Sequence, residues 1–318
     1  MIAMDERPPL GDEVQVADGG IVHVIAAAWA AIDAIDVDYG PQADAVDGLD
    51  LQLQTALLAR PGAPCNAVTL IAPRGTGKSR ALAMLAKRSR RDAVDGARRV
   101  LSVNMDTAGT VESVPSAILA ALGEPRHDAG KPALRWIRAT TRLRDAGVRF
   151  VLFDEFNRAA RRSTMSGPIC EAIFEKIMEP GLAAVAFVGE DDASRALRRA
   201  PSVLERIDEE LDLGPLDWLR PGDDAIFADF IGRFEAEMLR LHLIDRPIGL
   251  GLGETPRLMC EATSGRLRRF VKIMKSATAE AIQRGDRSVT SRDLAQAVQD
   301  TVVKRGFLDG NPFEEFGN

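Results

Sequence analysis

Eight consecutive residues, Ala72 to Ser79, have the types and the order of a phosphate-binding loop. The segment APRGTGKS fits the pattern GxxxxGK[ST] at every fixed position except the first, where Ala72 stands in place of glycine. Gly75 and Gly77 would let backbone N–H groups turn towards a phosphate at the start of a helix, whose dipole favours anions. Lys78 would reach the β- and γ-phosphates of ATP, and the Ser79 hydroxyl would bind Mg²⁺. The residues predicted to contact nucleotide here are Pro73, Arg74, Gly75, Thr76, Gly77, Lys78, Ser79 and Arg80.

Two carboxylates follow an apolar run further along the chain. Residues 151–153 are Val-Leu-Phe, and Asp154 and Glu155 come directly after them. Ligands of open parallel sheets bind outside the carboxyl ends of the strands, so Asp154 can meet Ser79 and share Mg²⁺ with it. Glu155 would orient and deprotonate the attacking water, because phosphoryl transfer needs an in-line nucleophile. The pair predicts that bound ATP is hydrolysed.

The elements that must position these residues alternate along the first two thirds of the chain. Apolar runs predict strands at 67–71, 100–103, 149–153 and 182–188, and helical spacing separates them. This alternation predicts an α/β fold with a parallel sheet flanked by helices. Beyond residue 219 the apolar residues keep helical spacing only, which predicts a small all-helical domain.

The predicted organisation has four segments. Residues 1–50 form an N-terminal helical extension, 51–219 the nucleotide-binding core, 220–304 a helical lid domain and 305–318 a flexible tail.

Composition excludes several classes of protein. The chain has 318 residues, 46% of them hydrophobic, and a net charge of −6, which disfavours a protein that coats nucleic acid by bulk charge. Cys65, Cys170 and Cys260 lie far apart, which argues against a disulfide framework or a thiolate metal site. The sequence shows no signal peptide and no membrane-spanning segment, so we expect a cytoplasmic protein without a membrane partner.

The loop and the acidic strand end together resemble AAA+ ATPases with a glutamate base. In that family the next strand ends in a polar sensor, and Glu190 holds this position, where relatives more often have Asn, Thr or Ser. An arginine finger before the last core strand is implied too. Its candidates are Arg198, Arg199 and Arg206, of which we favour Arg206; a solvated helix face is the alternative for each.

The segment 264–269, SGRLRR, resembles the GxxR sensor of an AAA+ lid. Arg268 would then contact nucleotide from the helical domain and link ATP occupancy to the domain angle. A role for Arg269, or a purely structural charged face, is the competing interpretation.

Over most of residues 50–313 the chain resembles the TniB family, bacterial transposition ATPases akin to the TnsC and MuB target-selection proteins. The resemblance rests on 151–159, 204–218, 262–285, 289–298 and the Asn-Pro-Phe tail. It implies an ATP-dependent homo-oligomer, a ring or a helical filament, that assembles on duplex DNA without sequence specificity. It also implies a transposase and a target-selector protein as partners. Departures from the family are Ala72, Glu190 and Phe156-Asn157, where relatives tend to have an aliphatic residue and a histidine.

Basic residues directly after the acidic strand are the DNA-binding candidates. Arg158, Arg161 and Arg162 lie in a segment that a ring could turn towards a central duplex. Their phosphate contacts would be independent of sequence and sensitive to salt. A solvated charged surface is an equal alternative.

Two other functions fit the same residues. One is an AAA+ adaptor or loader that acts on a protein partner, such as a helicase or a secretion component, without DNA binding. The other is a nucleotide-binding switch that hydrolyses ATP poorly, which Ala72 and Glu190 would allow. Fold analogy alone does not choose among the three.

Overall fold

The computed structural model describes residues 20–92, 99–105, 108–160 and 166–314. The chain divides into two compact units. One, the sheet unit, comprises residues 38–215. The other, the helical unit, combines residues 1–37 with 216–318.

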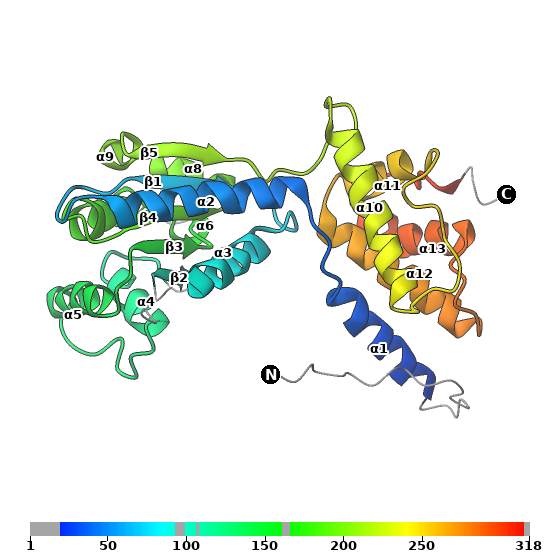
Figure 1. Ribbon diagram of the computed structural model, residues 1–318, viewed down its shortest axis with the longest axis horizontal. Helices are drawn as coiled ribbons and strands as arrows, with labels where there is room; N and C mark the ends of the chain where they lie inside the picture. Colours follow the sequence, from blue (N-terminus) through cyan, green and yellow to red (C-terminus); the bar gives the residue numbers. More distant parts are fainter. Residues whose placement is uncertain (1–19, 93–98, 106–107, 161–165, 315–318) are drawn as a thin grey trace. The chain divides into compact units, whose positions relative to one another are not determined.

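The sheet unit is built on five parallel strands in the order β2-β3-β4-β1-β5 (Figure 1). Their bounds are β1 Ala67–Ile71, β2 Val100–Asn104, β3 Phe150–Asp154, β4 Ala184–Gly189 and β5 Ile207–Leu211. The predicted strands coincide with β1 to β4, which confirms the α/β class and the parallel sheet. β5 lies at the sheet edge with exposed carboxylates at 208–210, and so lacks the apolar run that marks a buried strand.

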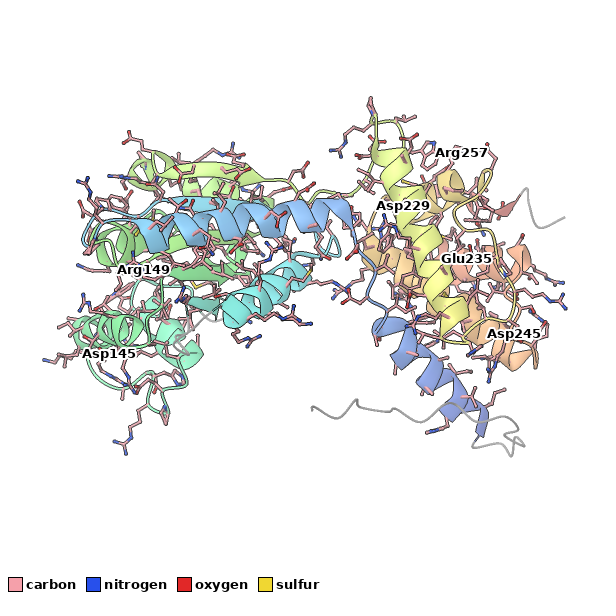
Figure 2. The ribbon with its side chains drawn as sticks, viewed as in Figure 1. Asp145, Arg149, Asp229, Glu235, Asp245 and Arg257 are labelled. Atoms are coloured by element: carbon pink, nitrogen blue, oxygen red, sulfur yellow. The ribbon has the colours of Figure 1, made fainter. Side chains whose placement is uncertain are left out.

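Helices flank the sheet. Their bounds are α2 Gly40–Leu58, α3 Lys78–Asp92, α4 Val114–Ala121, α5 Pro132–Asp145, α6 Asn157–Ala160, α7 Ser166–Ile173, α8 Asp191–Leu197 and α9 Pro201–Leu204, with a π-helical turn at Phe174–Met178. α2 contacts four of the five strands (Figure 1). A Cβ at Gly48 of α2 would overlap the Leu211 side chain of β5, so glycine allows this close packing. Arg149, labelled in Figure 2, donates to the carbonyl of Ala56 in α2 at 2.6 Å.

Apolar side chains at the ends of β3 and β4 form an aromatic cluster. Phe153, Phe156 and Phe187 are fully buried, and the ring centroids of Phe156 and Phe187 lie 4.8 Å apart. Phe156, which the family resemblance marked as a departure, is thus a core residue. Its packing anchors the chain directly after Asp154 and Glu155.

The helical unit contains α1 Gly20–Asp33, α10 Asp223–Arg240, α11 Thr255–Thr263, α12 Leu267–Gln283 and α13 Ser291–Thr301, with a 3₁₀ turn at Val303–Arg305. α1 packs on α12, where the Trp29 indole donates to the Lys275 carbonyl at 2.8 Å and Lys275 pairs with Asp33. Phe234 and Phe270 pack edge to face at 5.0 Å in its core. No helix among the described residues is both long and apolar enough to cross a lipid bilayer.

One part of the segment that we predicted to be a flexible tail, residues 311–313, is packed, whereas residues 305–307, 309 and 310 are exposed. Phe313 is 2% exposed, and the Asn311 amide donates to the Ala295 carbonyl of α13 at 2.8 Å. The Asn-Pro-Phe sequence therefore lies against the helical unit. The functional boundaries at residues 50, 219 and 304 stay predictions.

Candidate nucleotide-binding site

The phosphate loop joins β1 to α3. Gly75 and Gly77 have φ values of +85° and +108°, a left-handed backbone that favours glycine. Ala72 is buried, has a φ outside the left-handed region and donates its N–H to the Gly189 carbonyl at 3.0 Å. A Cβ is therefore tolerated at the first position of the pattern, and the departure from glycine at Ala72 does not disturb the loop.

Lys78 is the first residue of α3, and its ammonium lies over the loop. The Nζ atom donates to the carbonyls of Ala72 and Pro73, the latter at 2.9 Å. Burial lowers the pKa of Lys78, while the charges of Glu190, Glu155 and Asp154 act in the opposite direction and Arg74 lowers it further. All three predicted carboxylates are therefore close enough for their charges to act on the lysine. Arg74 and Glu190, which lie 116 positions apart in sequence, meet at the carboxyl ends of the parallel strands.

The end of β3 carries the predicted base in an unusual conformation. Asp154 ends the strand, and its Oδ1 accepts the N–H of Glu155 at 2.8 Å. Glu155 has a φ of +56°, a region that few residues other than glycine adopt. Its Oε2 atom is buried, accepts no hydrogen bond from the described residues and lies 3.6 Å from Nε of Arg158. This carboxylate thus keeps acceptor capacity for a further donor.

Glu190 follows β4 and is ion-paired. Its Oε1 accepts a hydrogen bond from Nε of Arg74 at 2.6 Å. Both side chains are partly exposed, at 57% for Arg74 and 31% for Glu190, so the pair contributes at most about 1 kcal/mol to stability. The ion pair thereby joins Glu190, the predicted sensor, to Arg74, a predicted nucleotide contact of the phosphate loop.

The arginine candidates lie in different places. Arg206 directly precedes β5 and is half-buried, and its carbonyl accepts the N–H of Ala67 at 2.7 Å. Arg198 and Arg199 are exposed at the end of α8, where Arg199 donates to Ser166 at 3.3 Å.

The lid arginines belong to the other unit. Arg268 is exposed on α12. Arg269 lies 4.4 Å from the Phe307 ring centroid and donates to the Ser264 hydroxyl at 2.9 Å. These contacts hold Arg269 within the helical unit, and the nucleotide contact of Arg268 stays a prediction.

Of the DNA-binding candidates, only Arg158 is described. It lies in α6 and is half-buried beside Glu155. Arg161 and Arg162 lie outside the described residues.

Three further polar residues lie near the carboxyl ends of the strands, and none of them was predicted to be a site residue; Asn157 was named only as a departure from the family. Asn104 ends β2 in register with Asp154, Asn157 is buried beside Gly189, and Gln42 of α2 donates to the Gly77 carbonyl at 2.8 Å. Asn104 could have been found as the polar end of a predicted strand. Nothing in the local sequence marks Gln42.

The oxygen donors fit Mg²⁺ bound together with a nucleotide. The Ser79 residue is exposed at the start of α3, which follows β1, and Asp154 ends β3, which is separated from β1 by β4 alone. Mg²⁺ in such sites takes one or two protein oxygens, and phosphates and water supply the rest. The described residues contain no group of three or more His, Cys, Asp or Glu side chains that could form an all-protein metal cage.

The model of the family described as "Bacterial TniB protein" matches residues 40–212, more than half of the chain. The chain belongs to the TniB family. The match to the TniB family runs from the first turn of α2 to the residue after β5, and so covers almost the whole sheet unit of this chain. No curated protein matches the chain.

Solved structures share the fold of this TniB-family chain. The ORC2 protein of Aeropyrum pernix in ADPNP–ADP complexes is 16% identical with a TM-score of 0.60, over 81% of this chain and 67% of that one. The ORC1 protein of the same organism in complex with DNA is 18% identical with a TM-score of 0.60, over 87% and 70%. Cdc6p of Pyrobaculum aerophilum is 15% identical with a TM-score of 0.59, over 86% and 70%. The fold is that of a P-loop NTPase of the AAA+ type, followed by a small helical domain.

Proposed function

We propose that this TniB-family protein is a cytoplasmic ATPase that regulates DNA transposition. In its ATP state it oligomerises on duplex DNA without sequence specificity and recruits a transposase. The observation that carries the proposal is the geometry of the phosphate loop, where Gly75 and Gly77 have left-handed backbones and Arg74 bonds the Glu190 carboxylate at the end of β4. The family supports the link to transposition, and the ORC1 protein in complex with DNA supports the link to DNA.

The residues divide the work of hydrolysis. Backbone N–H groups around Gly75 and Gly77 cradle the phosphates, and Lys78 holds the β- and γ-phosphate charge. Ser79 and Asp154 would hold Mg²⁺, which would supply positive charge to neutralise these phosphates. Glu155 accepts a proton from the water that attacks the γ-phosphate. Glu190 acts as the sensor of the γ-phosphate and holds the Arg74 side chain through their hydrogen bond.

Assembly would complete the site. Arg206 is proposed to stabilise the γ-phosphate of a neighbouring subunit, and Arg268 to contact nucleotide from the helical unit. Hydrolysis would then depend on oligomerisation, as expected of a switch that releases DNA once its ATP is hydrolysed.

The experiment is fluorescence anisotropy of a labelled random-sequence duplex with ATP, ADP or no nucleotide, at two salt concentrations. Lys78→Ala is compared with Lys304→Ala, which removes an exposed lysine of the helical unit. Binding that requires ATP, weakens with salt and is lost only in Lys78→Ala supports the proposal. Absence of DNA binding with every nucleotide would contradict it and favour an adaptor that acts on a protein partner.

The DNA-contacting residues need a separate variant. Arg158 is ion-paired with Glu155, so its reversal would alter hydrolysis as well as DNA binding. We therefore use Arg161→Glu with Arg162→Glu, and expect weaker duplex binding with unchanged ATP affinity. The matched control reverses the exposed pair Arg90 and Arg91 at the end of α3. Unchanged DNA affinity in the first variant removes this segment as the contact.

A further inference from the structure

A buried glutamine from outside the phosphate loop holds the loop. Gln42 lies in the first turn of α2, is 3% exposed, and donates from Nε2 to the carbonyl of Gly77 at 2.8 Å. A carbonyl oxygen only accepts hydrogen bonds, so the NH₂ group of the amide, and not its oxygen, must face Gly77. The contact therefore has one possible orientation.

The carbonyl of Gly77 accepts one hydrogen bond more than the first turn of α3 supplies. It already accepts the N–H groups of Arg80 at 3.0 Å and Ala81 at 3.1 Å, which form the first turn of α3. Gln42 thus adds a third donor to an acceptor that the helix satisfies. A Cβ on Gly77 would lie 2.8 Å from Nε2 of Gln42, so the amide packs directly against the glycine.

We propose that Gln42 is a positioning residue of the phosphate loop, and this inference rests on the proposed ATP binding at that loop. Gly77 is the residue before Lys78 and Ser79. By holding the Gly77 carbonyl, Gln42 sets the orientation of the peptide that leads into both functional side chains. A loop held in advance in its binding geometry loses less free energy when it orders around phosphate.

The place of Gln42 in the chain gives the contact a second consequence. Only residues 34–39 separate α2 from α1, which is attached to α12 of the helical unit by Trp29 and Lys275. The first turn of α2 is thus where the connector from the helical unit enters the sheet unit. Nucleotide that orders the loop should also order this turn through Gln42.

A purely structural role predicts something different. Any buried amide needs a hydrogen-bond partner, and Gly77 could serve only that need. Loss of the amide would then change the stability of the fold and leave the nucleotide affinity of folded protein unchanged.

The test is Gln42→Met, which keeps the length and burial of the side chain and removes the donor. Its control is Gln54→Met on the same helix, where the exposed amide donates to Asp50 of α2. We measure ATP affinity with a fluorescent ATP analogue, and thermal unfolding without nucleotide. We expect Gln42→Met to weaken ATP binding roughly fivefold to tenfold, the factor expected for one hydrogen bond, while Gln54→Met binds like wild type. Wild-type affinity in folded Gln42→Met overturns the inference, whereas failure of the wild-type chain to bind ATP overturns the proposed function instead.

Hydrogen exchange of the unaltered full chain provides a second measurement, which holds even where Gln42→Met folds poorly. We expect ATP to slow amide exchange in residues 40–44 as well as in the loop, and not in the C-terminal half of α2. Protection of the loop with no change at 40–44 would show that Gln42 does not couple α2 to nucleotide. Gln42→Asn keeps an amide but is one methylene too short for the contact, and we expect it to lose the protection at 40–44.

Discussion

Each unit of the molecule holds a partly or fully buried glutamate, and the two differ in how far their oxygens are satisfied. In the helical unit, Glu235 of α10, labelled in Figure 2, accepts the backbone N–H groups of Ile248, Gly249 and Leu250. In the sheet unit, Glu155 has a left-handed backbone and one buried oxygen that accepts no hydrogen bond from the described residues. Glu235 is thus saturated by its own chain, as a structural carboxylate requires, whereas Glu155 keeps acceptor capacity, as the catalytic role proposed for it requires.

The largest effect that this comparison predicts is on turnover. Glu155→Gln removes the base but keeps the shape, so we expect ATP hydrolysis to fall at least about 100-fold while ATP binding and thermal stability stay near wild type. Steady-state ATPase assays and calorimetric titration measure the two properties. The control is Glu179→Gln, an exposed glutamate of the same unit. Equal turnover in both variants would remove Glu155 as the base.

The second prediction concerns Glu235 of the helical unit, where we expect the opposite result: a loss of stability without a loss of ATP binding. Glu235→Gln places an NH₂ group against backbone N–H donors, so we expect the free energy of unfolding to fall by about 3 kcal/mol. ATP affinity per folded molecule should not change. Denaturant titration provides the measurement, with Glu237→Gln on the same helix as control, because that side chain pairs with nearby Arg240 on the helix surface. A loss of turnover without a loss of stability would give Glu235 a role that its contacts do not explain.

The third prediction concerns acid. Burial by itself would raise the pKa of Asp293, but hydrogen bonds from Arg284 and Thr290 outweigh it and lower the pKa. A lowered folded pKa means stability that is present at neutral pH and lost as pH falls below about 4. Asp293→Asn should cost about 1–2 kcal/mol at pH 7 and flatten the acid limb of a stability–pH curve. Exposed Asp224→Asn is the control, and an unchanged acid limb in Asp293→Asn would count against this assignment.

The smallest predicted effect is the change in the free energy of unfolding when Lys78 of the phosphate loop is replaced. Burial lowers the pKa of Lys78, so its ammonium is less favourable in the folded chain than in the unfolded chain at neutral pH. Lys78→Met should therefore leave the free energy of unfolding unchanged or raise it by less than about 1 kcal/mol, while nucleotide binding is lost. Thermal unfolding against exposed Lys304→Met checks this. A clear destabilisation would mean that Lys78 is structural.

Much of the fold was predictable because its signals are local. Buried parallel strands need continuous apolar runs, and β1 to β4 appeared as such runs. The glycines at 75 and 77 were recognisable because their backbone conformation is rarely open to other residues. β5 was not predictable in this way, since an edge strand with solvated carboxylates at 208–210 carries no apolar run.

The amino-acid sequence by itself determined the AAA+ class, the phosphate loop and the carboxylates at 154 and 155, because each depends on a short segment. Only the tertiary structure decided that Gln42 holds Gly77, that Glu155 adopts a positive φ and that α1 packs on α12. These features depend on contacts between residues far apart in the chain, or on a backbone that is held away from its local preference by surrounding packing. Neither leaves a pattern in nearby residue types, so folding had to bring the partners together before they could be recognised.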